Sequence, residues 1–138
     1  AADRAVHPEL ERYFRDHLEE ERGHAEWLAE DLASAGVRPQ FPHSRVVEIV
    51  GSIYYMIFHM HPAALLGYML VLESSPLTSE QLGTLENLHG APLLRTLRHH
   101  VRHDPDHLIR LCEMIDKSDK PDLICSAASK TLLLLRNA

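Results

Sequence analysis

One stretch near the start of the chain, residues 10–32, limits the possible folds more than any other. It is rich in good helix formers, with one glycine (Gly23) and no proline, so we predict a single long helix that begins near His7 and Pro8 and ends near Gly36. At 3.6 residues per turn, one stripe of this helix is apolar at both ends and carries imidazole and carboxylate groups in its middle. The stripe consists of Leu10, Phe14, His17, Glu21, His24, Leu28 and Leu32.

Glu21 and His24 are three residues apart, so both side chains can reach one point beside a helix. A buried carboxylate is unfavourable unless it is paired or bound to a metal ion. Glu-x-x-His motifs that point into a helical bundle are used by di-iron carboxylate proteins. Because the motif is short and common, the two side chains could instead form an ordinary hydrogen bond at the edge of a core.

The remainder of the sequence also has helical periodicity. We predict helices at residues 44–61, 63–74, 79–88 and 92–103, with Ser44 and Ser79 as N-caps, and a last helix that starts near Asp122. The helix that ends at residue 103 should restart or kink at Pro105. Short loops and a single core predict one all-α domain over residues 1–138, a helical bundle of about six or seven helices.

The bulky side chains of the 44–61 helix have two interpretations. They could line a pocket, or they could simply form the core. The residues are Tyr54, Tyr55, Met56 and Phe58.

Composition narrows the class of protein. The net charge is −6 and no basic cluster is present, which argues against a nucleic-acid partner. The two cysteines, Cys112 and Cys125, form no C-x-x-C pair, which indicates a reducing compartment. No apolar run is long enough to span a bilayer. We therefore expect a cytoplasmic protein without a membrane partner, which could form a homodimer through its apolar last helix.

Eleven of the 138 residues are histidine, which is an unusually high number. It is relevant because histidine is the commonest metal ligand among side chains. His100, Asp104 and His107 are spaced by four and three residues and should share one helix face. Asp104 could instead cap the helix that restarts at Pro105. Glu73 follows an apolar run, so it is either the first solvated residue after a buried helix or a carboxylate held for a metal ion. Imidazoles and carboxylates without thiolates suit iron or manganese.

The other histidines follow no ligand pattern, and we expect them at the surface or at helix caps. Two of them, His59 and His61, could hydrogen-bond to metal ligands. The full set is His7, His43, His59, His61, His89, His99 and His103.

Three segments, HLEEERGHAEWLAEDL, HPAALLGYMLVLE and HHVRHDPDHLIRL, resemble the haem-oxygenase-like di-iron oxidases, also called iron-containing redox enzymes. In that family one core helix carries Glu-x-x-His, a later helix ends in a motif like G-Y-x-x-x-L-E, and a third carries His-x-x-x-Asp-x-x-His. The order of the motifs agrees, and the resemblance covers residues 10–116. It implies the haem-oxygenase-like fold.

The resemblance also implies a function. Such a protein would be a non-haem iron oxidase or oxygenase that binds one or two Fe(II) ions, uses O₂ as co-substrate and oxidises a small molecule such as an amino acid, an amine or a fatty acid. The metal ligands that the motifs imply are Glu21, His24, Glu73, His100, Asp104 and His107.

One family feature has no counterpart in these residues. The family usually has an earlier helix that supplies a further Glu ligand. Either the bundle lacks this helix because the product is truncated or processed, or the helix is not included in these residues, or the site binds one metal ion; otherwise Glu20 or Glu48 would have to supply the ligand. One alternative function is a non-catalytic metal- or partner-binding bundle of the same fold. Another is a thiaminase-type hydrolase, although Cys112 and Cys125 lie off the ligand-bearing faces.

Overall fold

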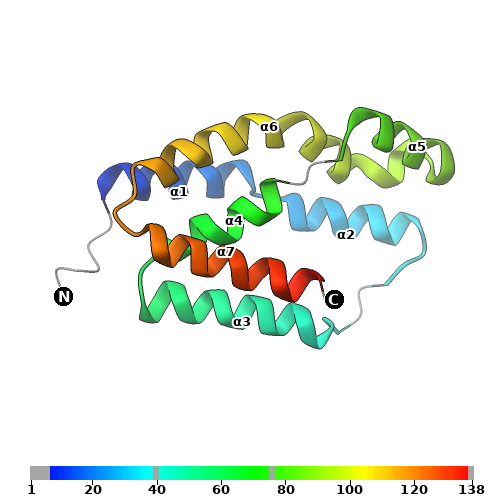
Figure 1. The fold of residues 1–138 in the computed structure, drawn as a ribbon. Coiled ribbons are helices and arrows are strands. Elements are labelled where there is room, and N and C mark those ends of the chain that lie inside the picture. Colours follow the sequence, from blue (N-terminus) through cyan, green and yellow to red (C-terminus); the bar gives the residue numbers. More distant parts are fainter. Residues whose placement is uncertain (1–6, 39–40, 75–76, 137–138) are drawn as a thin grey trace.

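The computed structural model describes residues 7–38, 41–74 and 77–136. All the regular structure in these ranges is helical (Figure 1), which confirms the all-α prediction. No helix in the described ranges is both long enough and apolar enough to cross a bilayer. The elements are α1 (Pro8–Glu20), α2 (His24–Ser34), α3 (Ser44–His59), α4 (Ala64–Glu73), α5 (Ser79–His89), the 3₁₀ turn η2 (Ala91–Leu94), α6 (Arg95–Asp116) and α7 (Pro121–Arg136).

The prediction of one long first helix is wrong, because the chain breaks between α1 and α2. Gly23 has φ +91°, in the left-handed region that glycine adopts without the steric cost of a Cβ atom. Glu21 becomes the C-cap of α1 and His24 the first residue of α2. The break also turns α2, so that Leu28 and Leu32 of the predicted stripe are exposed.

Helix α4 lies at the centre of the bundle, in contact with α7, α6 and α3 (Figure 1). It is apolar on nearly every face, and Leu66 is completely buried. Gly67 allows α7 to approach closely, since a Cβ atom at this position would lie 2.2 Å from the carbonyl oxygen of Ile124. The G-Y-x-x-x-L-E motif thus begins at a helix crossing and ends with Glu73 at the last residue of α4.

Helix α6 passes through Pro105 without interruption, so the predicted restart is wrong. Pro105 is exposed, and its missing N–H removes one backbone hydrogen bond from the helix. Asp104 is buried inside the helix and is therefore not an N-cap. Its position keeps His100, Asp104 and His107 on one continuous face.

Other element ends differ from the predictions by one to three residues. α3 ends at His59, and η2 precedes a helix that begins at Arg95. The N-caps are His43 and Thr78 in place of the serines that follow them, because the His43 ring accepts a backbone N–H and Thr78 forms a capping box with Gln81.

Candidate metal centre

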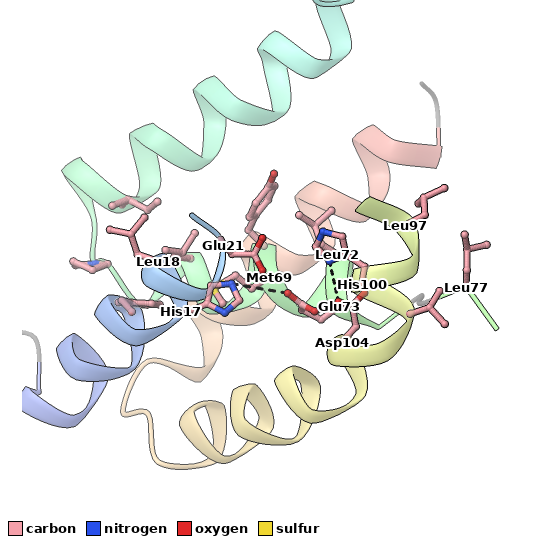
Figure 2. Close-up of a pocket in the computed structure, with 16 residues that line it drawn as sticks. His17, Leu18, Glu21, Met69, Leu72, Glu73, Leu77, Leu97, His100 and Asp104 are labelled. Atoms are coloured by element: carbon pink, nitrogen blue, oxygen red, sulfur yellow. Dashed lines mark hydrogen bonds and ion pairs between the residues drawn. The ribbon is translucent and has the colours of Figure 1, made fainter. Parts of the chain in front are cut away.

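Three overlapping groups of ligand atoms lie where α1, α2, α4 and α6 meet. Within each group, one nitrogen or oxygen atom per residue lies within 4.8 Å of the others. Figure 2 shows His17, Glu21, Glu73, His100 and Asp104 turned toward one another from three different helical segments. The groups are His17, Glu21 and His107; Glu21, His24 and His100; and Glu73, Asp104 and His107. All six residues that the motifs imply as ligands are therefore brought together, with His17 in addition.

The group around His24 contains two buried polar atoms that lack a partner. His24 Nδ1 lies 2.7 Å from Glu21 Oε2 across the break between α1 and α2. This contact leaves His24 Nε2 and Glu21 Oε1 buried without a hydrogen-bond partner among the described residues. Unpaired buried polar atoms are rare and unfavourable. A cation bound between these atoms and His100 would satisfy both.

The group around His107 has a similar defect. His107 Nε2 lies 3.5 Å from Glu20 Oε2, whereas its Nδ1 is buried without a partner in the described part of the chain. Asp104 Oδ1 lies 3.0 Å from His100 Nδ1, which links this group to that of His24. Glu73 Oε1 lies 4.0 Å from His17 Nε2, too far for a hydrogen bond.

Negative charge concentrates at this point. Burial, and then the negative charges of Asp104 and Glu21, raise the pKa of Glu73 from its ordinary 4.5 to about 7. Burial lowers the pKa of His17, which favours the neutral imidazole that binds metal ions. The residues that line the cavity beside Glu73 include no Lys or Arg to balance the carboxylates, and a divalent cation held here would balance their charge.

Two long-range contacts hold the ligand-bearing helices together. Asp31, buried in α2, accepts hydrogen bonds from the backbone N–H and the hydroxyl of Thr96 at 2.9 and 2.8 Å. Glu20 at the end of α1 accepts a hydrogen bond of 2.9 Å from Arg110. The partners are 65 and 90 residues apart in sequence, and no local sequence signal identified either pair.

Sequence reasoning also missed the place of Tyr13. Its ring stacks on that of His17 with centroids 6.0 Å apart, and its hydroxyl is buried without a partner in the described residues. Burial, and then the charge of Glu73, raise the pKa of Tyr13 to about 12, so the phenol stays protonated. The spacing of four residues between Tyr13 and His17 was the available signal.

A cavity of about 770 Å³ opens beside the ligand groups (Figure 2). Its polar lining residues are His17, Glu21, Glu73, His100, Asp104 and Tyr68, and its other walls are apolar. These walls come mainly from α1, α4 and α6, with Ile57 from α3. The apolar lining residues are Phe14, Leu18, Ile57, Pro62, Leu65, Met69, Leu72, Leu77, Leu97 and Val101.

The expected role of the bulky α3 side chains is only partly correct. Met56 is buried in the core, as one interpretation proposed. Tyr54, Tyr55 and Phe58 are each about 60% exposed and do not line the cavity beside the ligands.

Several other candidates lie outside the ligand groups. His59 stacks on Tyr55 at the surface, and the buried His61 accepts the Ala63 N–H through Nδ1. Glu48 pairs with Arg45 on α3. Cys112 and Cys125 are free and exposed.

Comparison with known proteins adds no family assignment. No family model matches the chain, and no match was found among curated proteins or solved structures. The case for a metal centre therefore rests on the motifs and on the geometry that the fold gives them.

Proposed function

We propose that this protein is a non-haem iron oxidase or oxygenase that uses O₂ to oxidise a small molecule. One observation carries the proposal: carboxylates and imidazoles from distant segments converge, and three of their buried atoms have no partner within the described chain. These atoms are Glu21 Oε1, His24 Nε2 and His107 Nδ1. A structural core would pair such atoms, whereas a metal site leaves them free to coordinate.

The donor set favours iron over structural zinc. It holds three carboxylates and four imidazoles, a mixture typical of oxygen-reactive iron or manganese sites. Glu21, His24 and His100 would hold one ion, and Glu73, Asp104 and His107 a second. Bound Fe(II) would supply O₂ binding and oxidising power.

The protein's own contribution would be orientation and exclusion of water. Leu18, Met69 and Leu72 line the cavity close to Glu21 and Glu73 (Figure 2), so an apolar substrate would displace water from the ligands. The lining contains no Lys or Arg, and this favours an amine or an uncharged molecule. A substrate carboxylate would be repelled by the site's own carboxylates and could bind only through the metal.

The direct test is anaerobic loading with Fe(II), an iron count, and then optical spectra and O₂ consumption after exposure to O₂. We expect up to two tightly bound ions per chain and O₂ consumption that depends on them. Bound iron without O₂ consumption would favour the non-catalytic metal-binding alternative. Absence of tightly bound iron would reject the proposal.

The first variant to test is His24→Ala. Its Nε2 has no other partner among the residues that the structure describes, so the substitution should abolish tight iron binding while circular dichroism shows nearly unchanged helicity. His59→Ala is the control, because His59 is exposed and stacks on Tyr55. Wild-type iron content in His24→Ala would contradict the site.

The second variant tests whether the Asp104 carboxylate is a metal ligand. Asp104→Asn should weaken metal affinity by roughly 10- to 100-fold, the size of effect seen when groups around a metal site are altered. Asp106→Asn, an exposed neighbour on the same helix, should leave affinity unchanged. Equal affinities in the two variants, measured by competition with a chelator, would remove Asp104 from the site.

A further inference from the structure

Six of the eleven histidines form an unbroken series of ring contacts that leads from the surface of α6 to both ends of the ligand cluster. Four of the six belong to the ligand groups, and the other two, His99 and His103, do not. The centroid distances are 5.4 Å for His17–His107, 6.5 Å for His107–His103, 4.3 Å for His103–His99, 4.7 Å for His99–His24 and 5.1 Å for His24–His100.

His99 and His103 lie one turn apart on α6 and toward solvent. Their rings stack with an interplanar angle of 29°. His103 is exposed and His99 half-buried. Two histidines at positions i and i+4 of a helix can bind one metal ion together, as in zinc proteases. Because His103 is exposed, its ring has room to turn toward a shared ion.

No structural role accounts for this pair. His7 and His43 cap helices, and His61 accepts the Ala63 N–H through Nδ1. In contrast, no hydrogen bond or ion pair joins His99 or His103 to another group in residues 7–38, 41–74 and 77–136. Their only ring partners are each other, Trp27 and the histidines of the cluster.

The inner neighbours of the pair are two residues with buried nitrogens that lack partners in the described part of the chain. His99 lies against His24, whose Nε2 is such an atom, and His103 lies near His107, whose Nδ1 is the other. The surface pair therefore lies beside the rings of His24 and His107, which belong to different ligand groups.

We propose that His99 and His103 form an outer site that captures a divalent transition-metal ion from solvent and passes it to the buried ligands through His24 and His107. The inference rests on the proposed function, because it assumes that the buried groups receive the ion. Each transfer exchanges one imidazole ligand for another, and the other donors of the buried groups would replace the water molecules that the ion still holds. No change of oxidation state is involved.

Trp27 provides the measurement. It is the only tryptophan, and its ring centroid lies 5.4 Å from that of His99 and 4.9 Å from that of His24. A bound Co²⁺ ion should quench its fluorescence. The experiment mixes limiting Co²⁺ with the metal-free protein in a stopped-flow instrument under anaerobic conditions and follows the quenching. Gel filtration afterwards gives the number of tightly held ions.

The test variant is His99→Gln with His103→Gln, which removes both imidazoles but keeps polar side chains of similar size. We expect quenching to slow by roughly tenfold or more, as for other groups that support a metal site, and the number of tightly held ions to stay the same. Control substitutions of two exposed histidines outside the series, His59→Gln with His89→Gln, should leave the rate unchanged. A wild-type rate in the test variant, or equal slowing in the control, would overturn the proposal.

A third variant separates this inference from the proposed function. Glu73→Gln with Asp104→Asn weakens one of the two buried ligand groups, so it should keep the fast quenching while it loses one of the tightly held Co²⁺ ions. If the wild-type protein itself holds no ion through gel filtration, the proposed function fails. Loss of fast quenching in the His99→Gln, His103→Gln variant would still support the outer site in that case.

Discussion

Two contacts in the bundle differ in the chemistry of their buried side chains. One joins α4 to α7, and the other joins α1 and α2 to α6. Where α4 meets α7, Leu66, Ile124 and Ala127 are almost entirely buried, and Gly67 brings the two backbones together. On the side of α6, the buried residues include His24, Asp31, Asp104 and His107. The first contact therefore draws on apolar burial, whereas the second buries groups that are costly without partners.

Helix α4 forms part of the apolar contact and also reaches the ligand cluster of the polar contact. This explains how the fold tolerates the buried polar groups. Its middle, at Leu66 and Gly67, is fixed by α7 and the core. Its end presents Glu73 to the ligand cluster. A rigid apolar contact thus holds a carboxylate where its charge is disfavoured, as functional sites commonly require. Substitutions should accordingly have opposite effects on stability in the two contacts.

The largest expected effect is in the apolar contact. Gly67→Ala would place a methyl group 2.2 Å from the Ile124 carbonyl oxygen and 2.9 Å from the Ala128 nitrogen. Both are backbone atoms, so the helices must separate, and we expect a loss of about 3 kcal/mol or more in the free energy of unfolding. Urea denaturation measures it.

Gly51→Ala is the matched control, because Gly51 lies in α3 with nothing within 4 Å of an added Cβ atom. It should stabilise the protein by about 0.5–1 kcal/mol, the usual gain for a helical alanine. Similar effects at both positions would mean that α4 and α7 are not in close contact.

The same contrast explains what the sequence could reveal. Helical periodicity identifies apolar faces, and it predicted helical structure in both contacts, although it joined α1 to α2 and divided α6. Glu21 and His24 meet as expected even though their helix breaks, because Glu21 keeps its backbone bond to the His17 carbonyl and the break spans only a few residues. The spacing of Glu21 and His24 therefore predicted their contact correctly, although the prediction of a single helix was wrong.

What the sequence could not reveal depends on how distant segments pack. A single glycine inside a helical pattern is usually tolerated, so the sequence did not predict the left-handed turn at Gly23. The Asp31–Thr96 hydrogen bonds join α2 to the start of α6, and local patterns carry no information about such pairs. The sequence predicts His99 and His103 at the surface or at helix caps, because the proximity of His99 to His24 appears only when α2 packs on α6.

In the polar contact, removing a charge should stabilise the metal-free protein. The pKa of Glu73 is about 7 in the folded chain and near its ordinary 4.5 when unfolded. The folded state thus binds more protons between these pH values, and Glu73 makes the protein less stable as pH rises through them. At pH 8, Glu73→Gln should raise the free energy of unfolding by about 2 kcal/mol, less than the full shift implies because solvent screens the site.

Urea denaturation in the presence of a chelator, at pH 4 and at pH 8, tests this sign. The stability gain should be nearly absent at pH 4, where the folded chain already holds the proton. Glu26→Gln, an exposed position on α2, should show no such pH-dependent gain. A Glu73→Gln variant that is less stable at pH 8 would show that Glu73 has a favourable partner in the metal-free protein.

The smallest effect concerns the turn that sets the angle between α1 and α2. Gly23→Ala forces a Cβ atom into φ +91°, at a cost of about 1 kcal/mol. Space is not the obstacle, since the new atom would meet only Trp27 Nε1 at 3.8 Å. Relaxation toward a continuous helix would turn His24 away from His100, so we expect weaker Co²⁺ binding together with the small stability loss.

Gly36→Ala separates these two effects, because Gly36 also has positive φ (+72°) with nothing within 4 Å, but it lies beyond the end of α2. It should cost a similar amount of stability, about 1 kcal/mol, and leave Co²⁺ affinity unchanged in a chelator competition. Equal Co²⁺ affinity in both variants would mean that the ligand cluster tolerates a change in the α1–α2 angle. The polar contact would then be adaptable where the apolar contact is rigid. A methyl group added at Gly67 forces α4 away from α7, whereas one added at Gly23 would leave the ligands able to bind the ion.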